Sequence, residues 1–330
     1  RKVKAEIGDL YPPIPDPGYK GEIPPIEFDR ETAEWVISRR GAEAQSTDDD
    51  PFAPRQRVLA FAAERQPHLT PAADLRPPTS GIPTGYLMPV AYLWTRTVTC
   101  KNPACGATVP LVKQTWLCKK DGRYVAMRMV APKGEKQARF EVVEATTAAG
   151  LGFDPEAFSK AGNATCLFCG AVADSDYVKV EGCGDRMGTQ PMAVACTRPG
   201  AQGKVYLATS SAPGAVPDDA AIRQRIKALC QRAGLTVPSE LLVNDAKNAN
   251  FCILYGLTSF DKLFTTRQML CLLTLAAAVR ESAVAVGAQT GPGHAQALAV
   301  VLAAMVDKQA DFNSAQCTWN YTGGRGIGHS

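Results

Sequence analysis

The sequence predicts an α+β fold, in which a small antiparallel β-module is followed by a helical part with two long helices. Three observations predict it: runs of alternating β-branched and aromatic residues fill much of 91–200, cysteine pairs bracket most of these runs, and residues 261–313 are apolar at helical spacing. The chain has 330 residues, of which 45% are hydrophobic and 21% are charged, which is ordinary for a soluble globular protein.

Residues 1–90 form a proline-rich arm. The prolines cluster at 12–17, 24–25 and 77–78, and this density excludes long helices and sheets. Apolar residues at helical spacing predict short helices over 29–40 and 54–66. We therefore expect this segment to wrap a neighbouring domain, because it has too little regular structure for a core of its own.

Two cysteine pairs, each followed at once by glycine, are the most informative motif. They are Cys100 and Cys105, then Cys166 and Cys169. A glycine after the second thiol suits a knuckle whose backbone bends so that two sulfurs can meet one ion. Four thiolates from two such half-sites make a closed structural zinc site. The sequence therefore predicts structural Zn²⁺ at these four residues, with a disulfide or free thiols as the alternatives.

The remaining cysteines indicate a reducing compartment. Seven lie at irregular positions outside the pairs: Cys118, Cys183, Cys196, Cys230, Cys252, Cys271 and Cys317. An odd remainder is not typical of a secreted disulfide scaffold. No run of eighteen apolar residues and no apolar signal core is present, so we expect a cytoplasmic protein without a membrane span.

A zinc-ribbon-like β-meander is predicted over 91–200. Strands are expected at 92–99, 109–117, 124–130 and 139–143, and a second pair at 176–181 and 192–196. Turns rich in glycine and lysine separate the middle strands, which places a meander between the two cysteine knuckles.

Positive charge is concentrated in this module. Between residues 96 and 139 there are ten basic residues and two acidic ones, giving +8 within a chain whose total is +4. A field of this size attracts polyanions, and nearby Trp116, Tyr124 and Phe140 could stack on bases if exposed. The alternative is an ordinary solvated face. The candidate nucleic-acid contacts are Arg96, Lys101, Lys113, Lys119, Lys120, Arg123, Arg128, Lys133, Lys136 and Arg139.

The C-terminal part is predicted to be helical. Residues 201–260 contain a linker and an amphipathic helix from 217 or 218 to about 233, ended by Gly234, while 251–256 reads as a short buried strand or an extended loop. Residues 261–330 contain a helix over 269–286 that begins at a capping box, a second helix over 294–311, and a glycine-rich tail. The two long helices should form an antiparallel hairpin that packs against something larger.

No catalytic constellation stands out in the sequence. Its three histidines, His68, His294 and His329, lack a nucleophile signature nearby, and no P-loop or dinucleotide fingerprint is present. We therefore predict no catalytic and no cofactor-binding residue in this chain.

Five stretches, in order, resemble the zinc-ribbon-containing adenine-specific DNA methylases of bacteria and archaea, a phage-defence-associated family. The stretches are Ile-Gly-Asp-Leu-Tyr-Pro at 7–12, Ala-Tyr-Leu-Trp-Thr-Arg-Thr-Val at 91–98 with the knuckle at 100–106, the second knuckle at 162–170, Tyr-Gly-Leu-Thr at 255–258 with 263–268, and 311–314 with 317–320.

The resemblance implies a central fragment of such a methylase. In that family the first S-adenosylmethionine motif lies upstream of such a region and the catalytic Asp-Pro-Pro-Tyr lies downstream, and neither is in this chain. The parent protein would methylate the amine of a flipped-out adenine with S-adenosylmethionine. This fragment would supply target recognition, DNA contacts and helices that pack on the methyltransferase core, and would be inactive alone. The alternative is a structural or protein-docking zinc module that binds other methylase segments or defence-system proteins.

Overall fold

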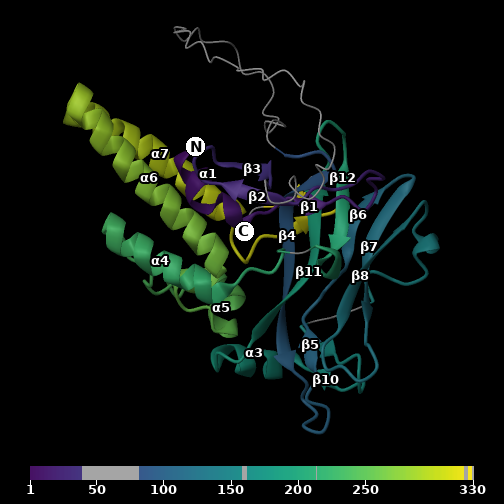
Figure 1. The fold of residues 1–330 in the computed structure, drawn as a ribbon. Coiled ribbons are helices and arrows are strands. Elements are labelled where there is room, and N and C mark those ends of the chain that lie inside the picture. The colour runs from purple at the N-terminus through teal and green to yellow at the C-terminus, as the bar shows by residue number, and fades with distance from the viewer. Residues whose placement is uncertain (39–81, 158–161, 213, 323–325, 329–330) are drawn as a thin grey trace, which may run out of the picture.

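The computed structural model describes the chain except residues 39–81, 158–161, 213, 323–325 and 329–330. It has a mixed α and β architecture with six α-helices and several antiparallel sheets among the described residues, so the mixed fold class is confirmed (Figure 1). The strands gather on one side of the molecule and the long helices on the other.

A five-stranded antiparallel sheet lies at the centre. Its order is β1-β4-β11-β12, and β5 pairs with the C-terminal end of β4 on the edge opposite β11. The strands are β1 (Ile14–Pro15), β4 (Tyr86–Thr99), β5 (Thr108–Pro110), β11 (Gly188–Thr197) and β12 (Lys204–Ala208). The strands expected at 92–99 and 192–196 therefore exist and pair with each other, so residues about 100 positions apart in the chain are neighbours in the sheet.

A three-stranded meander forms the second sheet. It consists of β6 (Trp116–Lys120), β7 (Arg123–Val130) and β8 (Arg139–Ala145), in that order. The strands predicted at 124–130 and 139–143 are confirmed. The strand predicted at 109–117 is instead two: β5 ends at Pro110, which cannot donate a ladder hydrogen bond, and β6 begins at Trp116 in the other sheet.

The two sheets face each other across the largest apolar core. Side chains from both are completely or almost completely buried there: Ala91, Leu93, Leu117, Val125, Met127, Phe140, Ala193, Ala195 and Tyr206. Trp319 closes one edge and donates its indole N–H to the Leu117 carbonyl oxygen at 2.9 Å. Trp116 and Phe140 are only 4% and 5% exposed, so the exposure that base stacking requires is not met by these two rings.

Three two-stranded hairpins complete the strands. They are β2 (Ile26–Asp29) with β3 (Glu34–Ile37), β9 (Ala164–Thr165) with β10 (Val172–Ala173), and β13 (Trp319–Asn320) with β14 (Gly326–Ile327). The helix predicted over 29–40 is wrong in its described part. Ala33 lies at φ +61° in the β2–β3 turn, and Phe28 pairs with Trp35 across the strands. The helix predicted over 54–66 falls outside the described residues.

Two short segments differ from their predictions. Residues 176–181, expected as a strand, belong to helix α3 (Ser175–Cys183), because the Asp174 carboxylate accepts from the Tyr177 N–H and caps the first turn. The stretch at 251–256, expected as a strand or loop, is the end of α5 (Ala246–Phe251) and a 3₁₀ turn, η4 (Ile253–Tyr255). Local alternation of valine with polar residues was therefore outweighed by capping.

The helical part has its own core. Helices α1 (Lys2–Ile7), α4 (Asp219–Ala233) and α6 (Thr266–Thr290) bury Ile7, Ile222, Ile226, Leu229, Met269, Leu270, Leu273 and Ala277 together. The predicted features of these helices are confirmed. Gly234 ends α4 at φ +59°, and Thr265 and Gln268 form the predicted capping box of α6.

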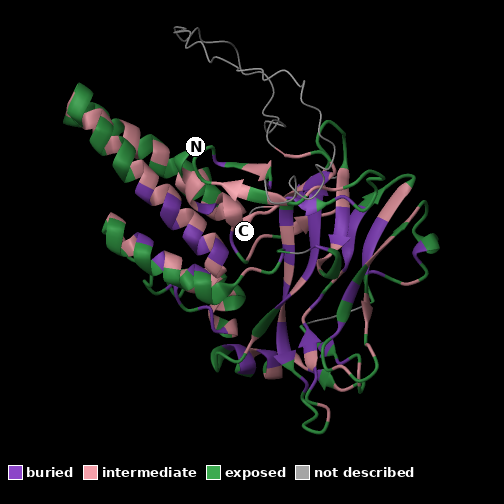
Figure 2. Ribbon diagram, in the orientation of Figure 1, coloured by how far each residue is buried: buried purple, intermediate pink, exposed green. Residues whose placement is uncertain are grey.

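Helix α7 (Pro292–Phe312) returns along α6 as the expected antiparallel hairpin. The far half of this hairpin projects beyond the rest of the molecule, and no residue of α7 is buried (Figure 2). The expectation that α6 is buried on several sides therefore holds only for its first half.

Among the described residues, α6 is the one helix long and apolar enough to cross a membrane by length and composition. In its most apolar 18-residue window, 28% of the residues are buried inside the structure, and one such helix is weak support for a membrane span.

Candidate metal centre

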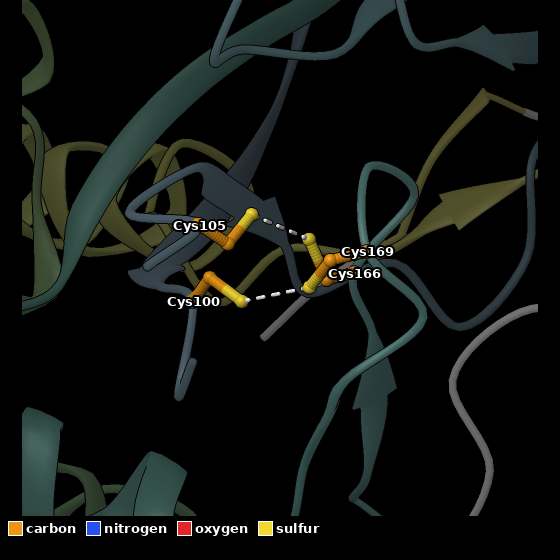
Figure 3. Close-up of side chains that lie close together, drawn as sticks. All are labelled: Cys100, Cys105, Cys166 and Cys169. Carbon is orange, nitrogen blue, oxygen red and sulfur yellow. Dashed lines mark hydrogen bonds between the residues drawn. The ribbon is translucent and has the colours of Figure 1, made fainter. Parts of the chain in front are cut away.

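The four predicted cysteines meet at one point of the structure. Cys100 and Cys105 lie in the loop between β4 and β5, and Cys166 and Cys169 lie in the turn between β9 and β10 (Figure 3). All four sulfurs are within 4.8 Å of one another. Two segments more than 60 residues apart are thereby brought together, as the spacing of the motif predicts.

The sulfur geometry fits a tetrahedral metal. The Cys100 and Cys169 sulfurs are 3.5 Å apart, and those of Cys105 and Cys166 are 3.8 Å apart. Zinc–sulfur bonds of about 2.3 Å at the corners of a tetrahedron place sulfurs about 3.8 Å apart. A disulfide would need about 2.05 Å, and all four thiols are free. Each close pair also takes one sulfur from each knuckle, so one ion would join both.

The two knuckles have the same backbone design despite their different spacing. The N–H of the first cysteine donates to the carbonyl of the residue two beyond the second cysteine, Cys100 to Ala107 at 2.7 Å and Cys166 to Ala171 at 2.8 Å. The glycine after each second cysteine is left-handed, with φ +60° at Gly106 and +74° at Gly170. Glycine adopts this conformation without strain, which is why it follows each pair.

The thiols differ in acidity. Burial raises the pKa of the Cys100 thiol to about 12, whereas the backbone N–H of Ala171 lowers the pKa of Cys169 to about 7. Each thiol must lose its proton to bind a cation. Metal affinity should therefore rise with pH.

Two lysines brace the centre from outside. Lys101 forms an ion pair with Asp174, which links the first knuckle to the cap of α3. Lys136 donates to the Cys105 carbonyl oxygen at 2.6 Å, which links the knuckle to the loop before β8. Both lysines were expected to contact nucleic acid, and in this structure both hold the cysteine loops in place.

Four of the other eight predicted basic contacts also have acidic partners. Arg123 pairs with Glu144 at 2.8 Å, Arg128 with Glu141 at 2.7 Å, Lys119 with Glu156 at 3.9 Å, and Arg139 with Glu135. Arg96 is half-buried, and desolvation lowers its pKa. Lys113, Lys120 and Lys133 are exposed and form no ion pair within the described part of the chain. Four acidic partners outside the window, Glu141, Glu144, Glu156 and Asp174, therefore offset half of the +8 counted over 96–139.

A buried cation elsewhere was not foreseen. Arg267 is 6% exposed in the first turn of α6, with its guanidinium 3.9 Å from the Tyr92 ring centre and 5.2 Å from that of Tyr11. It donates to the Leu10 carbonyl oxygen at 3.3 Å. Three of the resembling sequence stretches thus meet at one cation–π contact between the central sheet and the helical part. The neighbours of Arg267 in this turn, Thr266 and Gln268, are polar, so no local pattern in the sequence indicated that the arginine is buried.

No protein-family model matches the chain, and no curated protein or solved structure matches it either. The resemblance to adenine methylases remains a prediction. The metal centre rests on its own geometry.

Proposed function

We propose that this chain is the zinc-stapled central region of an adenine-specific DNA methyltransferase, and that Cys100, Cys105, Cys166 and Cys169 hold one structural Zn²⁺. The convergence of four free thiols at tetrahedral spacing carries the zinc part of the proposal. Four thiolates complete the coordination sphere, so no position is left for a substrate. The ion's role is to stabilise the fold.

Zinc would join two parts of the β-region that are far apart in the sequence. The knuckle between β4 and β5 belongs to the central sheet, whereas the β9–β10 knuckle leads directly into α3. Around the sulfurs, residues of both knuckles share a buried cluster that includes Val98, Val109, Ala164 and Val178. A bound metal would add to the stabilisation that this cluster provides, because metal binding and folding are coupled.

Metal content and folding test the zinc site. We expect about one zinc per purified chain, loss of that zinc in Cys166→Ala, and retention in the matched control Cys118→Ala, because Cys118 is also buried but lies in the sheet core. Should Cys166→Ala fail to fold, titration of Co²⁺ into chelator-treated wild-type protein gives the answer by its thiolate charge-transfer absorption. Wild-type protein without zinc, or a Cys166→Ala variant that keeps it, would exclude the site.

The methyltransferase context and DNA binding are the second part of the proposal. The ordered motif resemblance supports them, together with the three exposed lysines Lys113, Lys120 and Lys133 that have no acidic partner in the described ranges. The expected activity of the fragment is duplex binding without methylation. S-adenosylmethionine would bind only the parent protein.

Salt dependence distinguishes DNA recognition from a protein-docking module. With about three phosphate contacts, the DNA affinity should fall about 40-fold between 50 and 200 mM salt, and by less in Lys113→Gln/Lys120→Gln/Lys133→Gln. A matched control is Lys179→Gln on α3, whose lysine is already paired with Asp176 at 3.0 Å. If the protein does not shift the mobility of duplex DNA at low salt, the protein-docking module is favoured. If the DNA affinity is the same at about 50 and about 200 mM salt, recognition through these lysines is excluded.

A further inference from the structure

Helix α7 carries two apolar seams, and only one of them is covered. The first is half-buried against α6 and repeats at helical spacing: Ala295, Leu298, Leu302, Val306 and Ala310. The second is exposed and has the i, i+3, i+4, i+7, i+8 spacing of a core-facing stripe: Ala297, Val300, Val301, Ala304 and Met305. Val300, Val301 and Met305 are 65%, 62% and 63% exposed. A helix with two apolar seams is typical of a bundle with more than two helices.

The end of the hairpin also lacks charge. No Asp, Glu, Lys or Arg occurs from residue 282 to residue 306, although a stretch of this length at the chain's 21% charged content would hold about five. Val284 on α6 is 76% exposed in the same region. A solvated face would carry charged side chains, so this surface has the composition of a covered one.

The length of these segments argues against a membrane as the cover. The charge-free part of α6 beyond Glu281 spans only residues 282–290, and that of α7 spans 292–306, both shorter than the roughly 20 residues that cross a bilayer. The first half of α6 cannot extend the span, because Leu270 and Leu273 are buried in the helical core.

We propose that a second copy of this chain covers the exposed seam of α7, so that two hairpins related by a twofold axis close a four-helix bundle. In a twofold contact each residue near the axis meets its own copy, so a charged residue there would face a like charge. The seam contains none. Its alanines allow close helix approach, and Val301 and Met305 supply the larger side chains that interdigitate. The far half of the hairpin projects away from both sheets (Figure 2). Val300, Val301 and Met305 are exposed, so the described elements leave this seam open to a second hairpin. This inference does not depend on the metal centre or on the methyltransferase proposal.

Sedimentation velocity on the full 330-residue chain tests the proposal. We expect a dimer at about 100 µM protein, and a rise of at least about 100-fold in the dimer dissociation constant for Val301→Lys/Met305→Lys, since two lysines per chain would be desolvated at the contact. The matched control Val243→Lys changes an equally exposed valine (71%) outside the hairpin and should remain dimeric. Unchanged thermal unfolding of the double variant at low concentration shows that the monomer fold is intact.

Two results would overturn the proposal. One is a monomeric wild-type chain at about 100 µM, and flotation of that monomer with phosphatidylcholine vesicles would then assign the seam to a lipid surface. The other is a dimer that survives Val301→Lys/Met305→Lys, since its contact would lie elsewhere.

Discussion

Gly256→Ala should destabilise the protein more than the same substitution at another glycine with a left-handed backbone. Gly256 follows η4 at φ +78°, and a Cβ at this position would overlap the Gly182 carbonyl, lying 2.6 Å from its carbon. Gly182 belongs to α3, so this backbone crossing joins the helix beside the metal centre to the helical part. Both partners of the crossing are main-chain atoms, which cannot rotate away as a side chain can.

The expected magnitude follows from two contributions. A left-handed conformation costs a non-glycine residue about 1–2 kcal/mol, and forcing two packed segments apart adds about 1–3 kcal/mol. We therefore expect Gly256→Ala to lower the free energy of unfolding by about 2–5 kcal/mol. The control is Gly234→Ala, because Gly234 has φ +59° but no atom within 4 Å of the position that a Cβ would occupy. It should lose only about 1–2 kcal/mol.

Urea denaturation of both variants, followed by tryptophan fluorescence, measures the difference. The wild-type protein and each variant should be compared at the same zinc concentration, so that metal linkage is held constant. Equal losses for Gly256→Ala and Gly234→Ala would refute the close crossing of α3 and η4, because the left-handed backbone would then account for the whole effect.

Two further substitutions test the ion pair at the edge of the central sheet and the start of α6. The Arg198 guanidinium donates to the Asp16 carboxylate at 2.6 Å and lowers the pKa of that buried carboxyl. The ion pair therefore contributes its full stabilisation above the ordinary aspartate pKa of about 3.9, and this contribution is lost as pH falls through the lowered pKa. Arg198→Gln should therefore cost about 1–2 kcal/mol at pH 7, and this deficit, measured by urea denaturation across pH 7 to 3, should shrink at the acid end; a constant deficit would contradict the pairing. Thr265→Ala should lower the free energy of unfolding by about 1 kcal/mol, because it removes the side-chain oxygen that caps the Gln268 N–H, while Thr265→Ser should restore most of that loss; an equal loss in Thr265→Ser would argue against the cap.

The sequence predicted best those elements whose determinants are local. The capping box at Thr265, the left-handed stop at Gly234 and the alternating strand at 92–99, now part of β4, each follow from a few neighbouring residues. The metal centre was also predictable, because a cysteine pair followed by glycine encodes a complete half-site. Which sulfur lies next to which could not be read from the sequence, since this depends on how β5 packs on β9.

The charge of the β-module was not predictable from a sequence window. Arg128 lies directly opposite Glu141 in the β7–β8 register, and Arg123 reaches Glu144 on the same pair of strands. Both glutamates follow the last basic residue of the window, so a linear count assigns to one segment a charge that its neighbour cancels. Electrostatics of a sheet follow strand register, which brings together residues 13 and 21 positions apart.

The position of the knuckles has a consequence for the order of folding. Thr97 and Gly188 are paired in the central sheet although they are about 90 residues apart, whereas the meander β6–β8 is built from consecutive strands. A metal that joins Cys100 to Cys169 shortens the effective path between β4 and β11 to about 20 residues, which lowers the entropic cost of closing that loop by about 1 kcal/mol. Bound early, the ion would act as a template for β4–β11 pairing, so the refolding rate of the central sheet should increase with zinc.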